Sequence, residues 1–580
     1  RNPEPGTRNP EPGTRNPMPL SIPFAKKLIQ PVDWLAVGSL FILTFGLHWG
    51  TLHGWWRWDD PQHLLFASRH GIWETFAVRD CYQQLSVASL TPWLAVSYKI
   101  DLVLFGLTPR WFYLHQLCVL WAGGAGLYAL LRIAINSVGW SLAGSGLFLI
   151  SAPVKFIAEQ LMTRHYGEGL VFLIIALLVY RHALKHDQLV FTLAATVAYL
   201  LAMTAKEVFV PLVIVLPFFP GFGWRQHWRH LIPMLVVAAG YVLWRRAMLG
   251  EFVGGPAAVS AGVEPGVVVA GLAQIPVILL GDSIVGLSTA GVFCGILIWF
   301  LARNKHLIGL VIMAAAGLIG PLVPLAVSPG LQVADRYFLV PWFGVCWLVV
   351  IVVHDLAVSG RGQWLAMSGF LVLTGLTGFQ TLVAHRMLTP LITEIETQQR
   401  FFWDSTSDRI MWPSSTVLLS FWNLNGLAKL KTEGHLWPSG ATIVSDEYDL
   451  SRLDLAGRTI WTYDPITGSM RDITADIPGR INLWKEQVFA DKPLSISLTY
   501  TNNRFAWNFG PYQNGQYHLI LTGHGESGTI PLPPTGIRKV RLEPLSFVVR
   551  YDSPDGWITY SSHLAFAPQS GTLNWNRSFP

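Results

Sequence analysis

Charged side chains are scarce in this sequence. Only 13% of its 580 residues are Asp, Glu, Lys or Arg, whereas soluble proteins of this size carry about a quarter. Hydrophobic residues make up 51% of the chain, and the mean hydropathy is positive at +0.39. Many apolar residues occur in runs that approach the ~20 residues a helix needs to cross a bilayer. This composition excludes an ordinary soluble protein and predicts a polytopic α-helical membrane protein.

Cysteine is also scarce, and patterns of metal ligands are missing. The four cysteines are scattered, and three of them lie inside apolar runs: Cys81, Cys118, Cys294 and Cys346. Such spacing supports neither a disulfide framework nor a metal site, so we predict no bound metal and no other cofactor. The net charge of +6 comes from short loops instead of a basic stripe, which argues against nucleic-acid binding.

The N-terminal stretch lacks apolar residues altogether. It reads "RNPEPGTRNPEPGTRNP", a heptad that is repeated and then begun a third time. We interpret residues 1–17 as a tag-like or artefactual repeat and Met18 as the native start. The first apolar run that follows is long and has no small-residue cleavage site, so a cleavable signal peptide is not expected.

Eleven apolar segments are candidate membrane spans, and two more are ambiguous. The candidates are 32–50, 111–131, 138–154, 167–180, 188–204, 207–219, 230–248, 284–302, 307–327, 337–356 and 364–384. Lys and Arg in short loops favour the cytoplasm, and the loops satisfy this bias when the ambiguous segments 91–107 and 266–282 do not cross. Segment 91–107 carries Lys99 and Asp101 between flanking prolines, as an interfacial helix does. We therefore predict eleven spans, with the N-terminus inside and the C-terminus outside.

The composition changes near residue 390, where apolar runs shorten and Gly, Pro, Asn, Ser and Trp become frequent. Segments 512–523 ("YQNGQYHLILTG") and 546–562 ("SFVVRYDSPDGWITYSS") each place an Asn-Gly or Asp-Gly turn beside residues that favour strands. We predict a transmembrane domain over 18–389, with its first outer loop at 51–110. Residues 390–580 are predicted to form an extracytoplasmic, mostly β domain, with a sandwich as one candidate topology.

The predicted orientation places a set of polar residues at the outer ends of the spans. The set is Asp59, Asp60, His63, Glu159, Arg164, His165, Glu168, Lys206, Glu207, Arg245, Arg246, Asp335, Arg336 and Tyr337. One interpretation is that they are helix-end residues that reach the lipid headgroups, as Lys and Arg often do. The other is a shared site, in which several cations bind a phosphate and a facing carboxylate accepts a proton as general base. A lipid-phosphate sugar is a substrate of that shape.

Four segments resemble a known family in their order, spacing and common face. They read "RWDDPQHL", "TPWLAVSYKIDLVLFGLTPRWFYLHQL", "TAKEVFVPL" and "ADRYFLVPWFG". Together they resemble the GT-C superfamily of glycosyltransferases, over roughly residues 30–390. The likeness is to the protein O-mannosyltransferase type and, more distantly, to the bacterial aminoarabinose lipid A transferase. The chain departs from many relatives by having "APVKFIAE" in place of "HPVHTE", and it has no tetratricopeptide repeat.

The resemblance implies an inverting sugar transfer from a polyprenyl-phosphate donor to an acceptor at the outer face. It implies that Asp59 activates the acceptor hydroxyl, with Asp60 as the alternative if the register is shifted by one. Glu159 takes the place of a second acidic residue, and Arg164 follows it as in the family.

The resemblance also implies a set of residues that hold the donor phosphate. These are Lys206 and Arg336, with Arg245 or Arg246 as a further cation and Tyr337 as a hydroxyl donor. The remaining candidates for the site are His63, Arg164 and Glu207.

Each motif also has a structural explanation. Asp before Pro is common in turns, so a solvated turn is the alternative explanation of Asp59 and Asp60. Lys206 and Glu207 are expected to pair with each other if they only end a span. Arg336 is explained by an interfacial anchor as well as by a phosphate site.

The leading hypothesis from the sequence is an integral membrane glycosyltransferase of a bacterial inner membrane, with its C-terminal domain in the periplasm. Its partners would be membrane lipids, a polyprenyl-phosphate sugar, a glycan, lipid or protein acceptor, and an envelope-complex partner at the C-terminal domain. One alternative is a transporter or flippase for lipid-linked sugars, which predicts polar residues near the bilayer midplane. Another is a catalytically inactive scaffold of an envelope complex.

Overall fold

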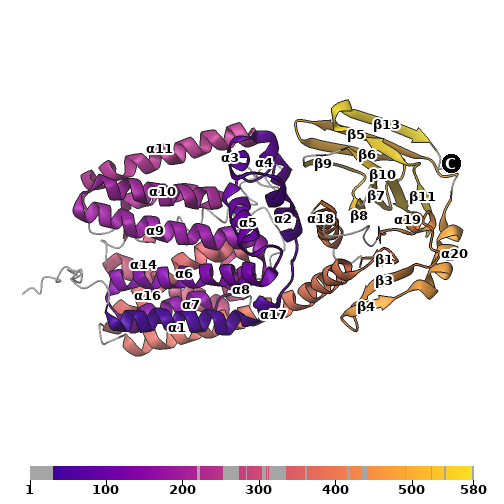
Figure 1. The fold of residues 1–580 in the computed structure, drawn as a ribbon. Helices are drawn as coiled ribbons and strands as arrows, with labels where there is room; N and C mark the ends of the chain where they lie inside the picture. The colour runs from indigo at the N-terminus through magenta and orange to yellow at the C-terminus, as the bar shows by residue number, and fades with distance from the viewer. Residues whose placement is uncertain are drawn as a thin grey trace, which may run out of the picture.

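Apolar helices form one half of the molecule, and a domain of strands and shorter helices forms the other (Figure 1). The computed structural model describes residues 30–218, 222–252, 274–281, 284–303, 308–309, 311–312, 335–358, 362–413, 419–433, 442–489, 491–523, 526–540, 542 and 544–577. The repeat at 1–17 and Met18 lie outside these residues. So do most of the predicted span 307–327 and of the ambiguous segment 266–282.

Within the described ranges, seven helices are long and apolar enough to cross a membrane. Four of them are single α-helices: α6 (Pro109–Ile135), α11 (Trp224–Leu249), α14 (Ile284–Arg303) and α17 (Gln363–Asp404). The other three combine an α-helix with a 3-10 turn: α1 with η1 (Pro31–His48, Trp49–His53), η2 with α9 (Leu161–Thr163, Arg164–His186), and η7 with α16 (Arg336–Phe338, Leu339–Val358). Several apolar helices in a mainly helical domain confirm the predicted fold class.

Two predicted spans differ from regular α-helices, and proline accounts for both. Segment 138–154 belongs to a pair of helices, α7 (Val138–Leu149) and α8 (Ala152–Glu159), bent by 54°, with Pro153 in the first turn of the second helix. Segment 207–219 forms two 3-10 helices, η3 (Glu207–Ile214) and η4 (Leu216–Phe218). Proline lacks an N–H and clashes with the preceding turn, so two prolines in this short segment, Pro211 and Pro217, disfavour a regular α-helix there. The described residues therefore hold seven spans, or eight with the bent pair, and the shorter apolar helix α10 (Leu189–Ala205).

Four short helices lie together at the end of the bundle that faces the C-terminal half (Figure 1). They are α2 (Asp60–Arg69), α3 (Ile72–Ala77), α4 (Arg79–Leu85) and α5 (Pro92–Phe105). Helix α5 is held there by its two charged residues. The Lys99 ammonium donates to the Ala67 carbonyl at 2.7 Å, and Asp101 pairs with Arg164 at 2.6 Å. Helix α5 has 14 residues and is not among the described helices that are long and apolar enough to cross a membrane; that segment 91–107 lies at the interface stays a prediction.

Helix α17 joins the two halves of the molecule. It is 42 residues long and runs without a break through Pro390, where the composition changes. Its apolar N-terminal part packs against α16, and its C-terminal part packs against α8 and α18 (Leu419–Glu433). Figure 1 shows it leaving the bundle and ending at the first strand of the C-terminal half.

The C-terminal half contains three sheets. The first has the order β2-β1-β3-β4, with β1 parallel to both of its neighbours. Its strands are β1 (Arg409–Trp412), β2 (Thr442–Ile443), β3 (Thr459–Asp464) and β4 (Ser469–Asp472), and α19 (Glu447–Ser451) and α20 (Ile477–Gln487) accompany them. This helix-covered sheet is a part of the domain that the sequence did not predict.

The other two sheets face each other as a sandwich around one apolar core. One sheet is β11-β10-β7-β8 with β12 on β10, and the second is β13-β5-β6-β9. Their strands are β5 (Leu494–Thr501), β6 (Arg504–Gly510), β7 (Gln516–Gly523), β8 (Glu526–Leu532), β9 (Thr535–Lys539), β10 (Leu545–Asp552), β11 (Ile558–Tyr560), β12 (Leu564–Phe566) and β13 (Thr572–Arg577). Large side chains such as Phe509 and Phe547 fill the space between the sheets.

The Asp-Gly pair of the sequence forms a hairpin turn, and the Asn-Gly pair does not. The Asp-Gly turn joins the antiparallel pair β10 and β11, and Gly556 takes the left-handed backbone, with φ 85°, that this turn requires. The Asn-Gly pair instead connects β6 to β7, which belong to different sheets. A tight hairpin occurs between β5 and β6, where Asn502 and Asn503 are both left-handed at φ 54° and 61°. Asparagine tolerates that conformation better than most residues.

Candidate functional site

The two adjacent aspartates of the first loop have separate environments. Asp60 begins α2 and is buried, and its carboxylate accepts hydrogen bonds from the Arg57 backbone N–H and the Tyr98 hydroxyl, both at 2.8 Å. Burial raises the pKa of Asp60 to about 7, although these two hydrogen bonds act in the opposite direction. Asp60 therefore closes the turn that precedes α2.

Asp59 is half-buried and stands just before α2. Its backbone carbonyl accepts from the N–H groups of Gln62 and His63 at 3.1 and 3.0 Å, so the main chain is fixed. Its carboxylate has no hydrogen-bond or ion-pair partner among the residues that the structure describes. The nearest titratable neighbours that act on it electrostatically are His63 and Asp60. Of the two aspartates, Asp59 is the one with a carboxylate available to a ligand.

Replacing Asp60 by Asn should remove a pH dependence of stability. The folded-state pKa of about 7 lies above the unfolded value of 3.8, so Asp60 contributes stability that is complete below pH 4 and lost as the pH rises through 7. Asparagine keeps a carbonyl acceptor for the Arg57 N–H but has no proton to lose. We expect the thermal unfolding midpoint in detergent to fall less between pH 5 and pH 8 in Asp60→Asn than in wild type. Equal falls would contradict the assignment.

Arg57 is the residue that holds the loop to the rest of the molecule. Its side chain is 4% exposed, and its Nη1 donates to the Glu159 carboxylate at 2.5 Å and to the Glu159 carbonyl at 2.7 Å. Its Nε donates to Glu396 of α17 at 2.6 Å. Glu159 also pairs with Lys155. The predicted second acidic residue is therefore engaged by two cations, and the sequence reasoning missed Arg57 although "RWDD" contains it.

Arg164 lies in a second ion-pair network, at the start of α9. It is fully buried, and its Nη2 pairs with Asp101 of α5 at 2.6 Å. Asp101 also contacts the His115 ring at 2.9 Å. Glu168, one turn after Arg164, accepts from the Ser97 hydroxyl at 2.5 Å. The charge of Arg164 is thus compensated within the protein, and the network fixes α5 against α6 and α9.

Arg245 and Glu207 form a third pair. The Arg245 Nε donates to Glu207 at 2.8 Å, and its other nitrogens donate to the carbonyls of Ala88 and Glu251. Glu207 also accepts from the backbone N–H of Leu90 at 2.6 Å. The next residue, Arg246, is exposed and lies over the Phe252 ring. Glu207 pairs with Arg245 at this span end, which leaves the neighbouring Lys206 without that partner.

Lys206 and Arg336 are two partly buried predicted cations that form no ion pair with another described residue. No carboxylate lies within ion-pair distance of either side chain in the described part of the chain. Lys206 Nζ lies 5.0 Å above the Tyr166 ring, and Arg336 lies 4.9 Å above the Tyr337 ring. The two rings contact each other edge-on, with centroids 5.8 Å apart. This arrangement brings together Tyr166 of α9, Lys206 at the start of η3, and Arg336 and Tyr337 of η7.

The two like charges influence each other. Burial lowers the pKa of Lys206 to about 8; Glu207 opposes this shift, and Arg336 adds to it. Charges of the same sign repel each other more strongly where water is excluded than in water. An anion between the two side chains would remove that cost. The geometry therefore suits an anionic group.

Two histidines link Asp59 to this pair of cations. His63 interacts electrostatically with Asp59, and His165 interacts with His63, Lys206 and Arg336. His165 is 7% exposed, and neither of its ring nitrogens has a hydrogen-bond partner among the described residues. The same holds for Nδ1 of His63. Buried polar atoms without partners are costly, and a bound ligand with polar groups would satisfy them.

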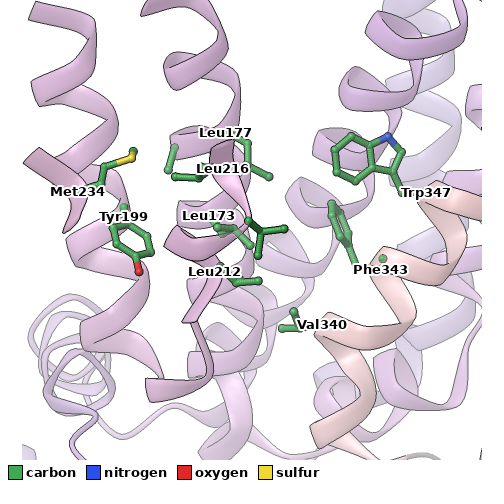
Figure 2. A pocket seen from close by; sticks show the side chains of 12 residues that line it. Leu173, Leu177, Tyr199, Leu212, Leu216, Met234, Val340, Phe343 and Trp347 are labelled. Atoms are coloured by element: carbon green, nitrogen blue, oxygen red, sulfur yellow. The ribbon is translucent and has the colours of Figure 1, made fainter. Parts of the chain in front are cut away.

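An apolar pocket lies inside the helix bundle (Figure 2). It encloses about 630 Å³ of empty space, part of it open to the surroundings. Figure 2 shows Val340, Phe343 and Trp347 following one another along α16, with Leu173 of α9 and Leu212 of η3 on the opposite wall. The remaining lining residues are Ala176, Leu177, Tyr199, Val215, Leu216, Met234 and Gly344.

The pocket and the cations share two helical elements. Val340 lies one turn after Arg336, and Leu212 lies in the 3-10 helix that Lys206 precedes. The segments that carry the cations thus continue into segments that line the pocket, with Val340, Phe343 and Trp347 following Arg336 along α16. A ligand with an anionic head and an apolar tail fits both parts.

One group of side chains in the described residues has the spacing of a metal site. Ligand atoms of His70, Glu74 and Cys81, from the C-terminal end of α2 and from α3 and α4, lie within 4.8 Å of one another. None of them belongs to the candidate site. Glu74 accepts from the Gly71 backbone N–H at 2.9 Å, a capping contact that explains its position without an ion.

The chain was compared with protein families, curated proteins and solved structures. No protein-family model matches the chain, and no curated protein matches it. The fold is similar to two crystal structures of ArnT from Cupriavidus metallidurans. One is bound to undecaprenyl phosphate and has 13% identity and a TM-score of 0.37, covering 81% of this chain and 94% of that chain. The other is the apo state, at 16% identity and a TM-score of 0.31, covering 75% of this chain and 93% of that chain.

Proposed function

We propose that the chain is an integral membrane glycosyltransferase of the GT-C type that takes a sugar from a polyprenyl phosphate. The observation that carries this proposal is the pair Lys206 and Arg336, two cations without an ion-pair partner among the described residues, on segments of the chain that continue into the lining of an apolar pocket. A phosphate would lie between the cations, since Arg and Lys bind phosphate as a fork and as a point charge. The polyprenyl chain would continue into the pocket.

The proposed reaction needs one base and one stabilised leaving group. Asp59 takes the proton from an acceptor hydroxyl, and the acceptor oxygen attacks the anomeric carbon of the sugar. The bond between that carbon and the phosphate oxygen breaks, and the configuration of the sugar is inverted. Polyprenyl phosphate leaves with the bonding electrons, and Lys206 and Arg336 stabilise its added negative charge.

The acceptor would approach from the side of the C-terminal half, where α18 packs against α2. We place this end of the bundle at the outer face, with the C-terminal half in the periplasm of a bacterial inner membrane. Acceptors of the glycan, lipid or protein class all present a hydroxyl group suited to this step. The sandwich also offers a surface for an envelope-complex partner.

The distribution of polar groups favours an enzyme over a flippase. Among the described residues, the candidate site collects at one end of the bundle, around α2, the N-terminus of α9 and η7. A transport path would instead require polar side chains along the bilayer midplane. An inactive scaffold would have no need for an unengaged carboxylate such as Asp59. The test is sugar transfer by purified protein in nanodiscs, from a panel of polyprenyl-phosphate sugars to envelope material; a protein that transfers none of them would contradict the proposal.

Phosphate binding should weaken above pH 8. Because the pKa of Lys206 is lowered to about 8, its ammonium is lost as the pH rises through that value, and the neutral amine no longer attracts phosphate. The phosphate itself is already a dianion above pH 7, since its second pKa is about 6. We expect the affinity for polyprenyl phosphate, measured in nanodiscs, to fall between pH 7.5 and pH 9.5.

The matched control is Lys206→Arg, which keeps the positive charge at all of these pH values. Its affinity should change little over the same range. A wild-type affinity that stays flat to pH 9.5, or an Arg variant that falls with the same slope, would remove Lys206 from the phosphate site.

A further inference from the structure

One face of α17 packs along the segment that leads into Asp59. Leu388 and Ile395 form one apolar cluster with Trp58, and the partly buried Ile392 packs against this cluster. One turn further, Glu396 and Arg400 reach the loop by hydrogen bonds. The spacing of these residues is that of one helical face, so α17 lines the loop over several turns.

The hydrogen bonds from this face go to the backbone as well as to side chains. Glu396 Oε1 accepts from the Trp55 backbone N–H at 2.8 Å and from Arg57 Nε at 2.6 Å. Arg400 Nη2 donates to the His53 carbonyl at 2.8 Å, and its guanidinium lies 5.0 Å above the Trp55 ring. Helix α17 therefore holds the chain at His53, Trp55 and Arg57, just before the two aspartates.

The loop has a feature that needs such support. Trp58, directly before Asp59, has a φ of 44°, a left-handed conformation that is unfavourable for a large side chain. Such conformations persist where the surrounding contacts hold them. Here two sets of contacts hold Trp58. They are the ion pairs of the preceding residue, Arg57, and the apolar cluster that Trp58 forms with residues of α17.

We propose that Glu396 is a positioning residue for Asp59, and that α17 thereby ties the geometry of the catalytic loop to the C-terminal half. The inference rests on the proposed function for the role of Asp59. Glu396 touches neither the cation pair nor the pocket in the described residues, and it acts through Trp55 and Arg57. The C-terminal half is thus a structural part of the site, because the helix that leads into it holds the base in place.

Two variants separate the contributions of Glu396. Glu396→Ala removes both the acceptor for the Trp55 N–H and the charge that faces Arg57. Glu396→Gln keeps an oxygen acceptor and removes only the charge, with almost no change of volume. The matched control is Asp404→Asn, which removes an exposed carboxylate two turns further along the same helix.

The first measurement is hydrogen–deuterium exchange of the peptide that covers residues 53–60, which does not depend on activity. Exchange should rise in Glu396→Ala, rise less in Glu396→Gln, and stay at the wild-type level in Asp404→Asn. Exchange in both Glu396 variants equal to that of the control would overturn the inference.

The second measurement is the kinetics of sugar transfer. Misplacing a catalytic group by about 1 Å costs on the order of 100-fold, so turnover at saturating donor should fall about 10- to 100-fold in Glu396→Ala and less in Glu396→Gln. The donor concentration for half-maximal rate should stay within about twofold, because the phosphate site is untouched. Unchanged turnover in a variant with raised exchange would refute the positioning role. Inactive wild-type protein would refute the proposed function instead.

Discussion

Asp59→Asn is expected to abolish sugar transfer while leaving donor binding intact. Asparagine has the same shape as aspartate but cannot accept the proton of an acceptor hydroxyl, and a general base contributes about 100- to 10,000-fold to the rate. The Asp59 carboxylate has no partner among the described residues, so its replacement should leave the fold unchanged. We expect turnover in membranes to fall by at least about 100-fold, at unchanged protein level and unchanged affinity for polyprenyl phosphate.

The neighbouring aspartate provides a sharp comparison. Asp60→Asn removes the same charge one residue away, but the Asp60 carboxylate is buried between Arg57 and Tyr98 and faces no ligand. Asp60→Asn should change the pH dependence of stability. It should lower turnover much less than Asp59→Asn does. Glu74→Gln, on the exposed surface of the same loop, should have no effect on either. Full activity in Asp59→Asn would remove the general base from the proposal, and loss of activity only in Asp60→Asn would move that role by one residue.

The double replacement Lys206→Ala with Arg336→Ala is expected to lose donor binding. Charge-assisted hydrogen bonds contribute about 1.5 to 3 kcal/mol each, so each single variant should weaken the binding of polyprenyl phosphate about 10- to 100-fold. The double variant should reduce binding below detection. The measurement is titration of polyprenyl phosphate into protein in nanodiscs, at low salt and near neutral pH.

Two control variants separate the phosphate site from general effects of charge. Arg246→Ala removes an exposed cation near the same end of the bundle and should bind like wild type. Arg245→Ala breaks the buried pair with Glu207, so it should lower thermal stability more than affinity, because an unpaired buried carboxylate is costly. Unchanged affinity in both Lys206→Ala and Arg336→Ala would remove the phosphate clamp.

Much of the fold could be predicted from apolar runs and charge placement. Long runs such as 111–131 correspond to helices of the bundle, and the charges Lys99 and Asp101 are the basis for predicting that segment 91–107 does not cross the membrane. Prolines inside the run 207–219 were visible, but hydropathy alone did not predict that they would produce 3-10 helices. The sheet with parallel strands in the C-terminal half depends on contacts distant in sequence, which local patterns do not reveal.

The candidate site could be predicted only as a set of residues. The sequence placed Asp59, Lys206 and Arg336 at one face because each lies at the end of a predicted span. It gave no means to decide which charges would be compensated, since the partners of Arg164 and Arg245 come from other elements. Asp101 lies 63 positions before Arg164 and was interpreted only as a sign of an interfacial helix.

Glu396 was missed for the same physical reason. It is separated from Arg57 by 339 positions, and it lies in a helix that the composition divided at residue 390. A carboxylate in an ordinary amphipathic stretch has no local signal of a role in a distant loop. Only the packing of α17 against residues 53–58 brings the two together.

The most direct test of the proposed function is a density map of the protein in nanodiscs with bound polyprenyl phosphate. We expect phosphate density between the side chains of Lys206 and Arg336, with His63 and His165 between the phosphate and Asp59. The first isoprene units should follow Val340 and Phe343 into the apolar pocket. A headgroup bound elsewhere in the molecule, with Lys206 and Arg336 still free of an anion, would contradict the proposed function.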